Sequence, residues 1–155
     1  MKNFFKFLGI ITLIAVIGFS MAACKNDDEE GGPDPALNGT WVSPVDSYGY
    51  ITEIKLDNGS LEVLRRLGQS GRLTPYQKGT YTTSGSSMTI HITHYYYMED
   101  WLTKDQLKST VSGGVSDDTI DRLFESSTGI WSISGDTLTV TSTVEEQSQT
   151  YTRKN

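Results

Sequence analysis

A strand–turn–strand pattern that occurs twice constrains the fold of this chain more than any other feature. Residues 79–90 (GTYTTSGSSMTI) align with residues 129–140 (GIWSISGDTLTV), at an offset of 50. In each copy, alternating apolar and polar residues flank a Ser-Gly turn, which is typical of a β-hairpin with one buried face. Two copies are too few for a solenoid. We therefore expect two equivalent hairpins of one antiparallel sheet.

Strand and turn composition extends over the whole folded region, which we place at residues 37–155. Short runs rich in Thr, Val, Ile, Tyr and Trp are separated by Gly, Ser and Asp, as strands are by turns. Asn58-Gly59 lies between two such runs, and Asn-Gly is a strong hairpin signal. The runs predict eight strands, at residues 39–44, 49–56, 60–66, 77–84, 87–96, 129–134, 136–144 and 148–154.

The apolar residues of these predicted strands fall on one face. Met88, Ile90 and Ile92 alternate with polar residues, and side chains two apart on a strand point the same way. Leu138, Val140 and Val144 share one face for the same reason. One apolar face per strand and mostly short connections predict an all-β fold, an antiparallel up-and-down barrel of about eight strands. An open sandwich of two sheets is the alternative.

One connection is long. About 30 residues separate the fifth and sixth predicted strands, which is more than a compact barrel leaves without structure. Residues 103–106 have the pattern of a helix capping box. A stripe at helical spacing follows, formed by Ile120, Leu123 and Phe124. We expect a short helical insertion of two helices, separated by Gly113-Gly114, on the barrel wall or over one mouth.

The amino-terminal residues, 1–23, have the layout of a secretory signal. Two lysines and no acids precede an apolar run over residues 7–19, and small residues precede Cys24. The lysines stay on the cytoplasmic side while the apolar run enters the bilayer. The alternative is an uncleaved transmembrane helix, because the apolar run is close to the length of roughly 20 residues that a span needs.

Met21-Ala22-Ala23-Cys24 resembles the bacterial lipobox, in which a large apolar residue and two small ones precede a cysteine. The resemblance implies that the thiol of Cys24 receives diacylglycerol, that the signal is removed and that the new amino terminus is acylated. Stable anchoring needs more than one acyl chain. Cys24 is the only cysteine, so the chain has no internal disulfide.

Residues 24–36 follow the cut site and carry four consecutive acids and a Gly/Pro stretch. Such a segment cannot bury apolar surface, so we expect a solvated tether. A lysine followed by acids also resembles the surface-export signals of Bacteroidetes lipoproteins, although Asn26 interrupts the match. Attachment to the outer membrane of a bacterial envelope is expected, facing either the periplasm or the outside.

The charge of the chain limits its partners. The signal holds two of the 13 basic residues and none of the 19 acids, so the mature chain has a net charge of −8. Nucleic acid needs a basic surface, and we expect none to bind. The length supports one domain with one modest core.

Gly39-Thr40-Trp41 in the first predicted strand and Arg153 in the last resemble the lipocalin family and its short bacterial relatives. The resemblance implies that Trp41 closes the barrel base and that Arg153 lies over its ring, a favourable contact. Gly39, Trp41 and Arg153 would then be structural. The chain departs from that family because it is shorter, lacks a disulfide and has its long connection late, which puts the usual deep ligand pocket in doubt.

No catalytic or metal site is evident in the sequence. His91 and His94 are three residues apart, which on a regular strand predicts opposite faces. There is no Gly-x-Ser-x-Gly elbow, and Gly113-Gly114 lacks the lysine of a phosphate loop. We expect neither an enzyme nor a cofactor.

Two features could serve binding. Tyr96 and Trp101 are aromatic residues near the long connection, of the kind found at ligand mouths, whereas Tyr95 is expected at the surface. Arg65 and Arg66, with Arg72 beyond, form the only basic cluster, and period two gives Arg65 the inward face of its strand. A buried arginine needs a carboxylate or a ligand anion; the alternative is that Arg65 lies at the strand end and reaches water.

These features lead to two hypotheses. In the first, the barrel holds a small apolar or amphipathic molecule between Arg65, Tyr96, Trp101 and the helical lid, which includes Phe124. In the second, the barrel is solid and its rim binds another envelope protein. The side chains that would fill a solid barrel are Trp41, Tyr81, Met88, Ile90, Ile92, Trp131, Leu138 and Val140.

Overall fold

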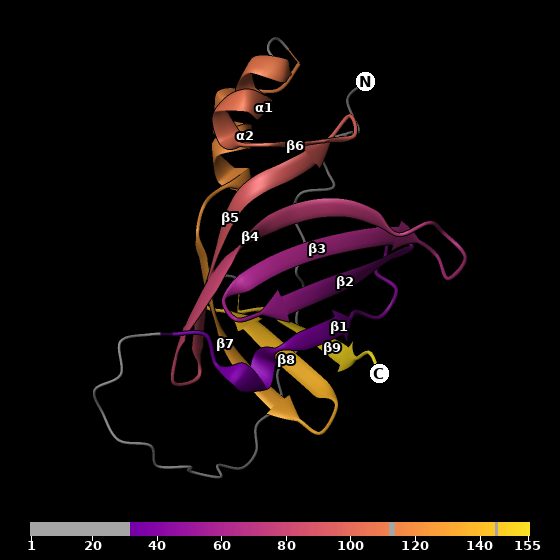
Figure 1. Cartoon of the computed structure of the whole chain (residues 1–155), viewed down its shortest axis with the longest axis vertical. Coiled ribbons are helices and arrows are strands. Elements are labelled where there is room, and N and C mark those ends of the chain that lie inside the picture. Colours follow the sequence, from indigo (N-terminus) through magenta and orange to yellow (C-terminus); the bar gives the residue numbers. More distant parts are fainter. Residues whose placement is uncertain (1–31, 112–113, 145) are drawn as a thin grey trace.

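The computed structural model describes residues 32–111, 114–144 and 146–155 (Figure 1). The predicted signal (1–23), Cys24 and the acidic run lie outside these residues. The elements are η1 (Pro35–Leu37), β1 (Gly39–Val42), β2 (Tyr50–Asp57), β3 (Ser60–Leu67), β4 (Thr74–Ser84), β5 (Ser87–Tyr97), β6 (Asp100–Leu102), α1 (Lys104–Thr110), α2 (Asp117–Leu123), β7 (Ser127–Ser134), β8 (Thr137–Ser142) and β9 (Ser148–Arg153).

Eight of the described strands form a closed barrel. Neighbouring strands follow the order β4-β3-β2-β1-β9-β8-β7-β5, and β5 pairs with β4 to close the ring. All of these pairings are antiparallel. The short strand β6 adds to β5 beyond the end of β7. The predicted all-β up-and-down barrel is confirmed.

The hairpin signals of the sequence are confirmed. Asn58 and Gly59 have φ angles of +45° and +89°, as a two-residue turn with positive φ at both positions requires. Ser84 pairs with Ser87, and Ser134 pairs with Thr137. The two copies of the repeat are therefore equivalent hairpins, each with a two-residue turn.

The end of the barrel that holds these three turns, which we call the base, is filled. Trp41 and Tyr81 are 0% and 1% exposed, at the centre of a cluster with Leu138 and Met88. All eight side chains expected to fill a solid barrel belong to this cluster or pack against it. The predicted set lacked Leu37, Leu56 and Tyr151, which are also buried there, together with Leu61 and Val63, to which period two gives the same inward face as Arg65. The expectation that Val144 shares the inward face of Leu138 is wrong: β8 ends at Ser142, and Val144 is 85% exposed.

Arg153 closes the base over Trp41. Its guanidinium carbon lies 4.1 Å from the centroid of the Trp41 ring. Nη1 and Nη2 of Arg153 donate to the carbonyl oxygens of Asn38 and Ala36, at 2.8 and 3.0 Å. Gly39 has a φ of +139°, and a Cβ there would lie 2.9 Å from Nη1 of Arg153. This is the contact that the resemblance to lipocalins implies.

The chain enters the barrel at the base. The carbonyl oxygen of Gly32 accepts hydrogen bonds from N and Oγ1 of Thr83, at 3.0 and 2.6 Å. Pro33 lies beside Gly59, and Leu37 is fully buried and accepts a hydrogen bond from Nε1 of Trp41. The last residues of the segment expected to be a solvated tether thus pack on the barrel.

A β-bulge in β5 changes which side chains of its upper half point into the barrel. The register with β4 shifts between Lys78 and Gly79, so that His91 pairs with Thr80 and His94 with Lys78. A Cβ at Gly79 would lie 2.2 Å from the carbonyl oxygen of His91, so only glycine allows this close approach. The prediction that His91 and His94 occupy opposite faces is wrong, because the bulge inserts one residue between them.

The helical insertion has the expected parts and one additional strand. The backbone N–H of Thr103 donates to Oε1 of Gln106 at 2.9 Å, which completes the predicted capping box of α1. Ser116 caps α2 by accepting from the N–H of Thr119. Figure 1 shows both helices beyond the upper end of β5, at the end opposite the base. We call this open end the mouth.

Candidate ligand-binding site at the barrel mouth

The mouth contains a cavity of about 900 Å³. Its strand side is formed by residues near the mouth ends of β2 to β5, among them Tyr50, Arg65, Tyr76, Tyr95 and Tyr96. Its helix side is formed by Leu107, Val111, Ile120 and Leu123. This volume lies within the range of small-molecule sites, roughly 300–1,000 Å³. The barrel is thus filled at the base and hollow at the mouth.

Helices α1 and α2 have seven residues each, too few for an isolated helix to be stable in water. They are held by an apolar face, because Leu107, Ile120 and Phe124 are buried against Tyr95. The Tyr95 and Phe124 ring centroids lie 5.4 Å apart. The helix side of the cavity therefore depends on packing against β5.

An ion cluster joins the two helices on their outer side. Nζ of Lys104 and Nζ of Lys108 each lie 2.9 Å from Oδ1 of Asp121. The hydrogen bond from Lys108, with a further one from Lys104, holds the pKa of the Asp121 carboxyl below its usual value, and Asp121 raises the pKa of Lys108. These groups are partly exposed to solvent, so the cluster orients the helices more than it stabilises the fold.

Arg65 faces into the barrel, as period two predicts, and two rings hold its guanidinium. Its guanidinium carbon lies 4.5 Å from the centroid of Tyr50 and 5.0 Å from that of Tyr76. Nη2 lies 3.1 Å from Oδ2 of Asp46. The Nε of Arg65 is buried and has no acceptor among the described residues. Arg65 therefore has its carboxylate partner, and its buried Nε is left unpaired among the described residues.

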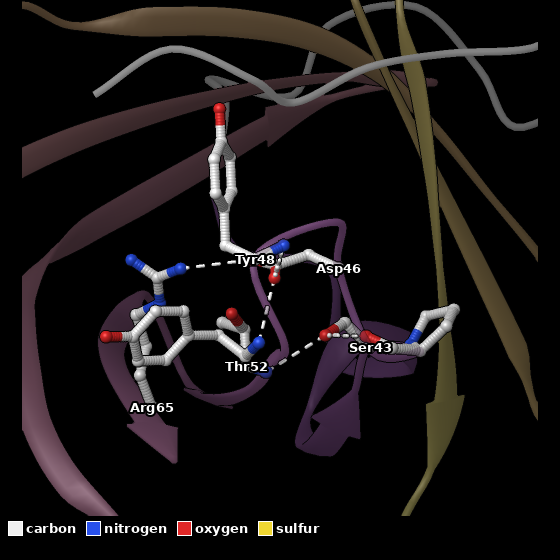
Figure 2. A network of polar contacts seen from close by, with 7 residues as sticks. Ser43, Asp46, Tyr48, Thr52 and Arg65 are labelled. Carbon is white, nitrogen blue, oxygen red and sulfur yellow. Dashed lines mark hydrogen bonds and ion pairs between the residues drawn. The ribbon is translucent and has the colours of Figure 1, made fainter. Parts of the chain in front are cut away.

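Asp46 is fixed by its own loop, the connection between β1 and β2 (Figure 2). Its Oδ1 accepts from the backbone N–H groups of Tyr48 and Tyr50, at 2.9 and 2.8 Å. In the same loop, Oγ of Ser43 accepts from the N–H of Thr52 at 2.9 Å. One oxygen of the carboxylate thus organises the loop while the other orients Arg65.

Tyr95 lies on the floor of the cavity. Its side chain is 8% exposed, its hydroxyl accepts a hydrogen bond from Nε2 of Gln77, and its ring packs edge-on against Tyr76 at 5.6 Å. Burial raises the pKa of this hydroxyl above its usual value, so the group stays neutral. The expectation that Tyr95 lies at the surface is wrong, because the bulge in β5 turns it inward.

The structure brings two of the four predicted ligand residues to one cavity. Arg65 and Tyr96 line it, whereas Trp101 and Phe124 are not among the lining residues. The Trp101 ring packs against Tyr96 at 5.2 Å and lies under Nζ of Lys78 at 4.0 Å. Phe124 is 8% exposed and supports the helix pair from below.

Sequence reasoning missed most of the cavity. Tyr50 could have been found, because period two from Ile54 in β2 gives Tyr50 the inward face. Tyr76 could not, because the β3–β4 register shifts between Val63 and Leu64 and leaves Tyr76 without a partner residue on β3.

Two further properties of the described residues bear on function. No three His, Cys, Asp or Glu side chains gather there in a group that could hold a metal ion. None of the helices described is long and apolar enough to cross a bilayer.

Comparison of the chain with family models, curated proteins and solved structures found no match.

Proposed function

We propose that this chain is a lipid-anchored, lipocalin-like barrel of the bacterial envelope that binds a small amphipathic molecule at its mouth. One observation carries the proposal: a cavity of about 900 Å³ at one end of a barrel that is filled at the other. The anchor would be lipid on Cys24, by resemblance to the lipobox.

The lining of the cavity supports an amphipathic ligand. Leu107, Val111, Ile120 and Leu123 give the helix side an apolar surface, while the strand side presents tyrosines and Arg65. Tyrosine combines an apolar ring with a hydroxyl that can hydrogen-bond. Apolar walls with a few placed polar groups are typical of small-molecule sites.

The alternative function, a solid barrel that binds another envelope protein, is less well supported. Seven of its eight predicted filling side chains belong to or pack against the base cluster alone, and Ile92 also packs against the cluster of Tyr95 and the helices. The mouth remains hollow, so the barrel as a whole is not solid.

Native mass spectrometry of the full chain, purified from a bacterial host in mild detergent, tests the proposal. We expect extra mass that is lost on denaturation, either as purified or after incubation with membrane lipid extract. Val111→Trp and Leu67→Trp each add bulk at the cavity and should abolish the extra mass. Val144→Trp, at a residue 85% exposed and outside the cavity lining, is the matched control. A bare mass under every condition would contradict the proposal and favour the protein-binding alternative.

A further inference from the structure

We infer that the ligand is an anionic amphiphile whose oxyanion head group is bound by the arginines of the β3–β4 side of the mouth, Arg65, Arg66 and Arg72. This inference rests on the proposed function, because it names the chemistry of the molecule that fills the cavity. Carboxylate, phosphate and sulfonate heads share the required chemistry, which is a compact group of oxygens that accepts several N–H donors.

The first observation is the charge of the cavity. Three arginines line it, and no Asp or Glu is among the described residues that do. The whole chain carries a net charge of −6. In a protein with an excess of acids, the described part of the cavity wall thus has three cations and no carboxylate. Such a wall attracts an anion and repels a cation.

The second observation is the supply of free donors. Nε of Arg65 and Nε of Arg66 are buried out of reach, so the terminal nitrogens are the donors that a ligand could reach. Nη1 of Arg65, Nη2 of Arg66 and both terminal nitrogens of Arg72 donate no hydrogen bond to a described residue, whereas Nη2 of Arg65 and Nη1 of Arg66 do. An oxyanion is the acceptor that matches a guanidinium, which binds it through two parallel N–H groups.

The ion pair between Asp46 and Arg65 offsets one of the three charges. Arg66 and Arg72 form no ion pair with any residue that the structure describes, and Nη1 of Arg66 donates to the carbonyl oxygen of Gln69 at 3.2 Å. Two positive charges at the mouth are therefore not compensated by any described residue. Arg65 adds hydrogen-bond donors, while Arg66 and Arg72 supply the net charge.

The opposite wall defines the other end of the ligand. Leu107, Val111, Ile120 and Leu123 line the helix side without a charge or a polar side-chain atom, and the hydroxyl groups of Thr110 and Thr119 are the polar groups that accompany them. A molecule with an acidic head and an apolar body satisfies both walls at once. A neutral lipid would leave the arginines unpaired, and a free inorganic anion would leave the apolar wall in water.

Two fluorescent dyes with the same aromatic frame test the inference on the full chain. Anilinonaphthalene sulfonate carries an anionic head, whereas phenylnaphthylamine lacks it, and both brighten in apolar surroundings. Each dye is titrated into the protein in a non-ionic detergent, and the signal of detergent alone is subtracted. We expect the sulfonate dye to bind about tenfold more tightly, as one charge-assisted hydrogen bond would give.

Single charge-removing variants locate the effect. Arg66→Gln and Arg72→Gln should each weaken the sulfonate dye several-fold and leave phenylnaphthylamine unchanged. Arg122→Gln removes an equally charged residue that is exposed on α2 and outside the cavity lining, so it should alter neither dye. Thermal unfolding of each variant confirms that the barrel remains folded.

The outcomes separate this inference from the proposed function. Equal binding of both dyes, or tighter binding of the sulfonate dye that Arg66→Gln and Arg72→Gln do not reduce, would overturn the anionic head group and leave an amphiphile pocket standing. Binding of neither dye, with no extra mass in native mass spectrometry, would overturn both proposals.

Discussion

The carboxylate of Asp46 lies 3.1 Å from Nη2 of Arg65 and is held there by two backbone N–H groups of its own loop. The loop between β1 and β2 therefore orients the side chain of Arg65 on β3. This coupling matters for binding because the same carboxylate that orients the guanidinium also cancels its charge.

Asp46→Asn should separate these two effects. Asparagine keeps an oxygen for the N–H groups of Tyr48 and Tyr50 but loses its charge, so the net charge of the mouth becomes more positive. We expect the sulfonate dye to bind a few-fold more tightly and the free energy of unfolding to fall by about 1 kcal/mol. Dye titration and urea denaturation measure the two quantities. Weaker dye binding would show that Asp46 matters more for orienting Arg65 than for cancelling its charge.

Arg153→Lys should weaken the base without changing the mouth. Lysine keeps the charge but cannot reach both carbonyl oxygens, of Asn38 and Ala36, while covering the Trp41 ring. We expect the free energy of unfolding to fall by about 1–3 kcal/mol, with dye affinities unchanged. Arg122→Lys, on an exposed face of α2, serves as the control. Full stability of Arg153→Lys would mean that the guanidinium does not hold the base together.

Gly79→Ala should be severely destabilising. The added Cβ would meet the backbone of β5 at 2.2 Å, so β4 and β5 must separate. We expect a loss of about 2 kcal/mol or more in the free energy of unfolding. Gly114→Ala is the matched control, because its Cβ would lie 3.6 Å from the nearest atom. Equal stability of the two variants in chemical denaturation would contradict the described register.

The ion cluster between the helices should depend on pH in one direction. The pKa of Asp121 is lowered in the folded protein by Lys108 and Lys104. Its contribution is therefore present above the unfolded pKa of about 4 and is lost as pH falls through the folded pKa. Asp121→Asn should speed hydrogen exchange in residues 104–123 at neutral pH, and the difference from the unaltered chain should vanish in strong acid. A difference that persists in strong acid would point to packing rather than charge.

The proposed anchor gives a simple mass measurement. The purified protein should begin at Cys24 and carry the extra mass of diacylglycerol and an acyl chain, and Cys24→Ser should lack that mass. An unaltered protein that begins at Met1 and has an unmodified cysteine would support the uncleaved transmembrane helix instead.

Alternation made most of the fold predictable from sequence. Period two identified the inward residues of the base because its hairpins have regular register up to Gly79. It also assigned Arg65 correctly, since β3 alternates without interruption and the extra residue, Tyr76, lies in β4. Strand β6 was missed because its turn uses Met98 and Glu99, with φ angles of +49° and +69°, and neither residue signals a turn.

The cavity could not be predicted in the same way. Its existence depends on how far the helix pair stands from the strand ends, and no local pattern encodes that distance. The bulges in β4 and β5 reverse the alternation of inward and outward side chains at Tyr76 and Tyr95. Period two therefore assigns the wrong faces where the mouth begins. The sequence does indicate which residue types could bind a ligand, and this is how Arg65 and Tyr96 were predicted as ligand residues.

Because Gly32 is attached at the base, the length of chain between Cys24 and Gly32 limits how the mouth can be oriented relative to the membrane. Only seven residues lie between Cys24 and Gly32, and the eight steps from one to the other, fully stretched, reach at most about 29 Å. A tilted eleven-residue strand such as β5 rises about 27 Å. With lipid on Cys24, the mouth could face the anchoring membrane squarely only if nearly the whole connection ran stretched along the outside of the barrel. In a barrel that stands upright on its base, the ligand therefore arrives through water or from a carrier, and not by sliding sideways out of the leaflet that holds the anchor.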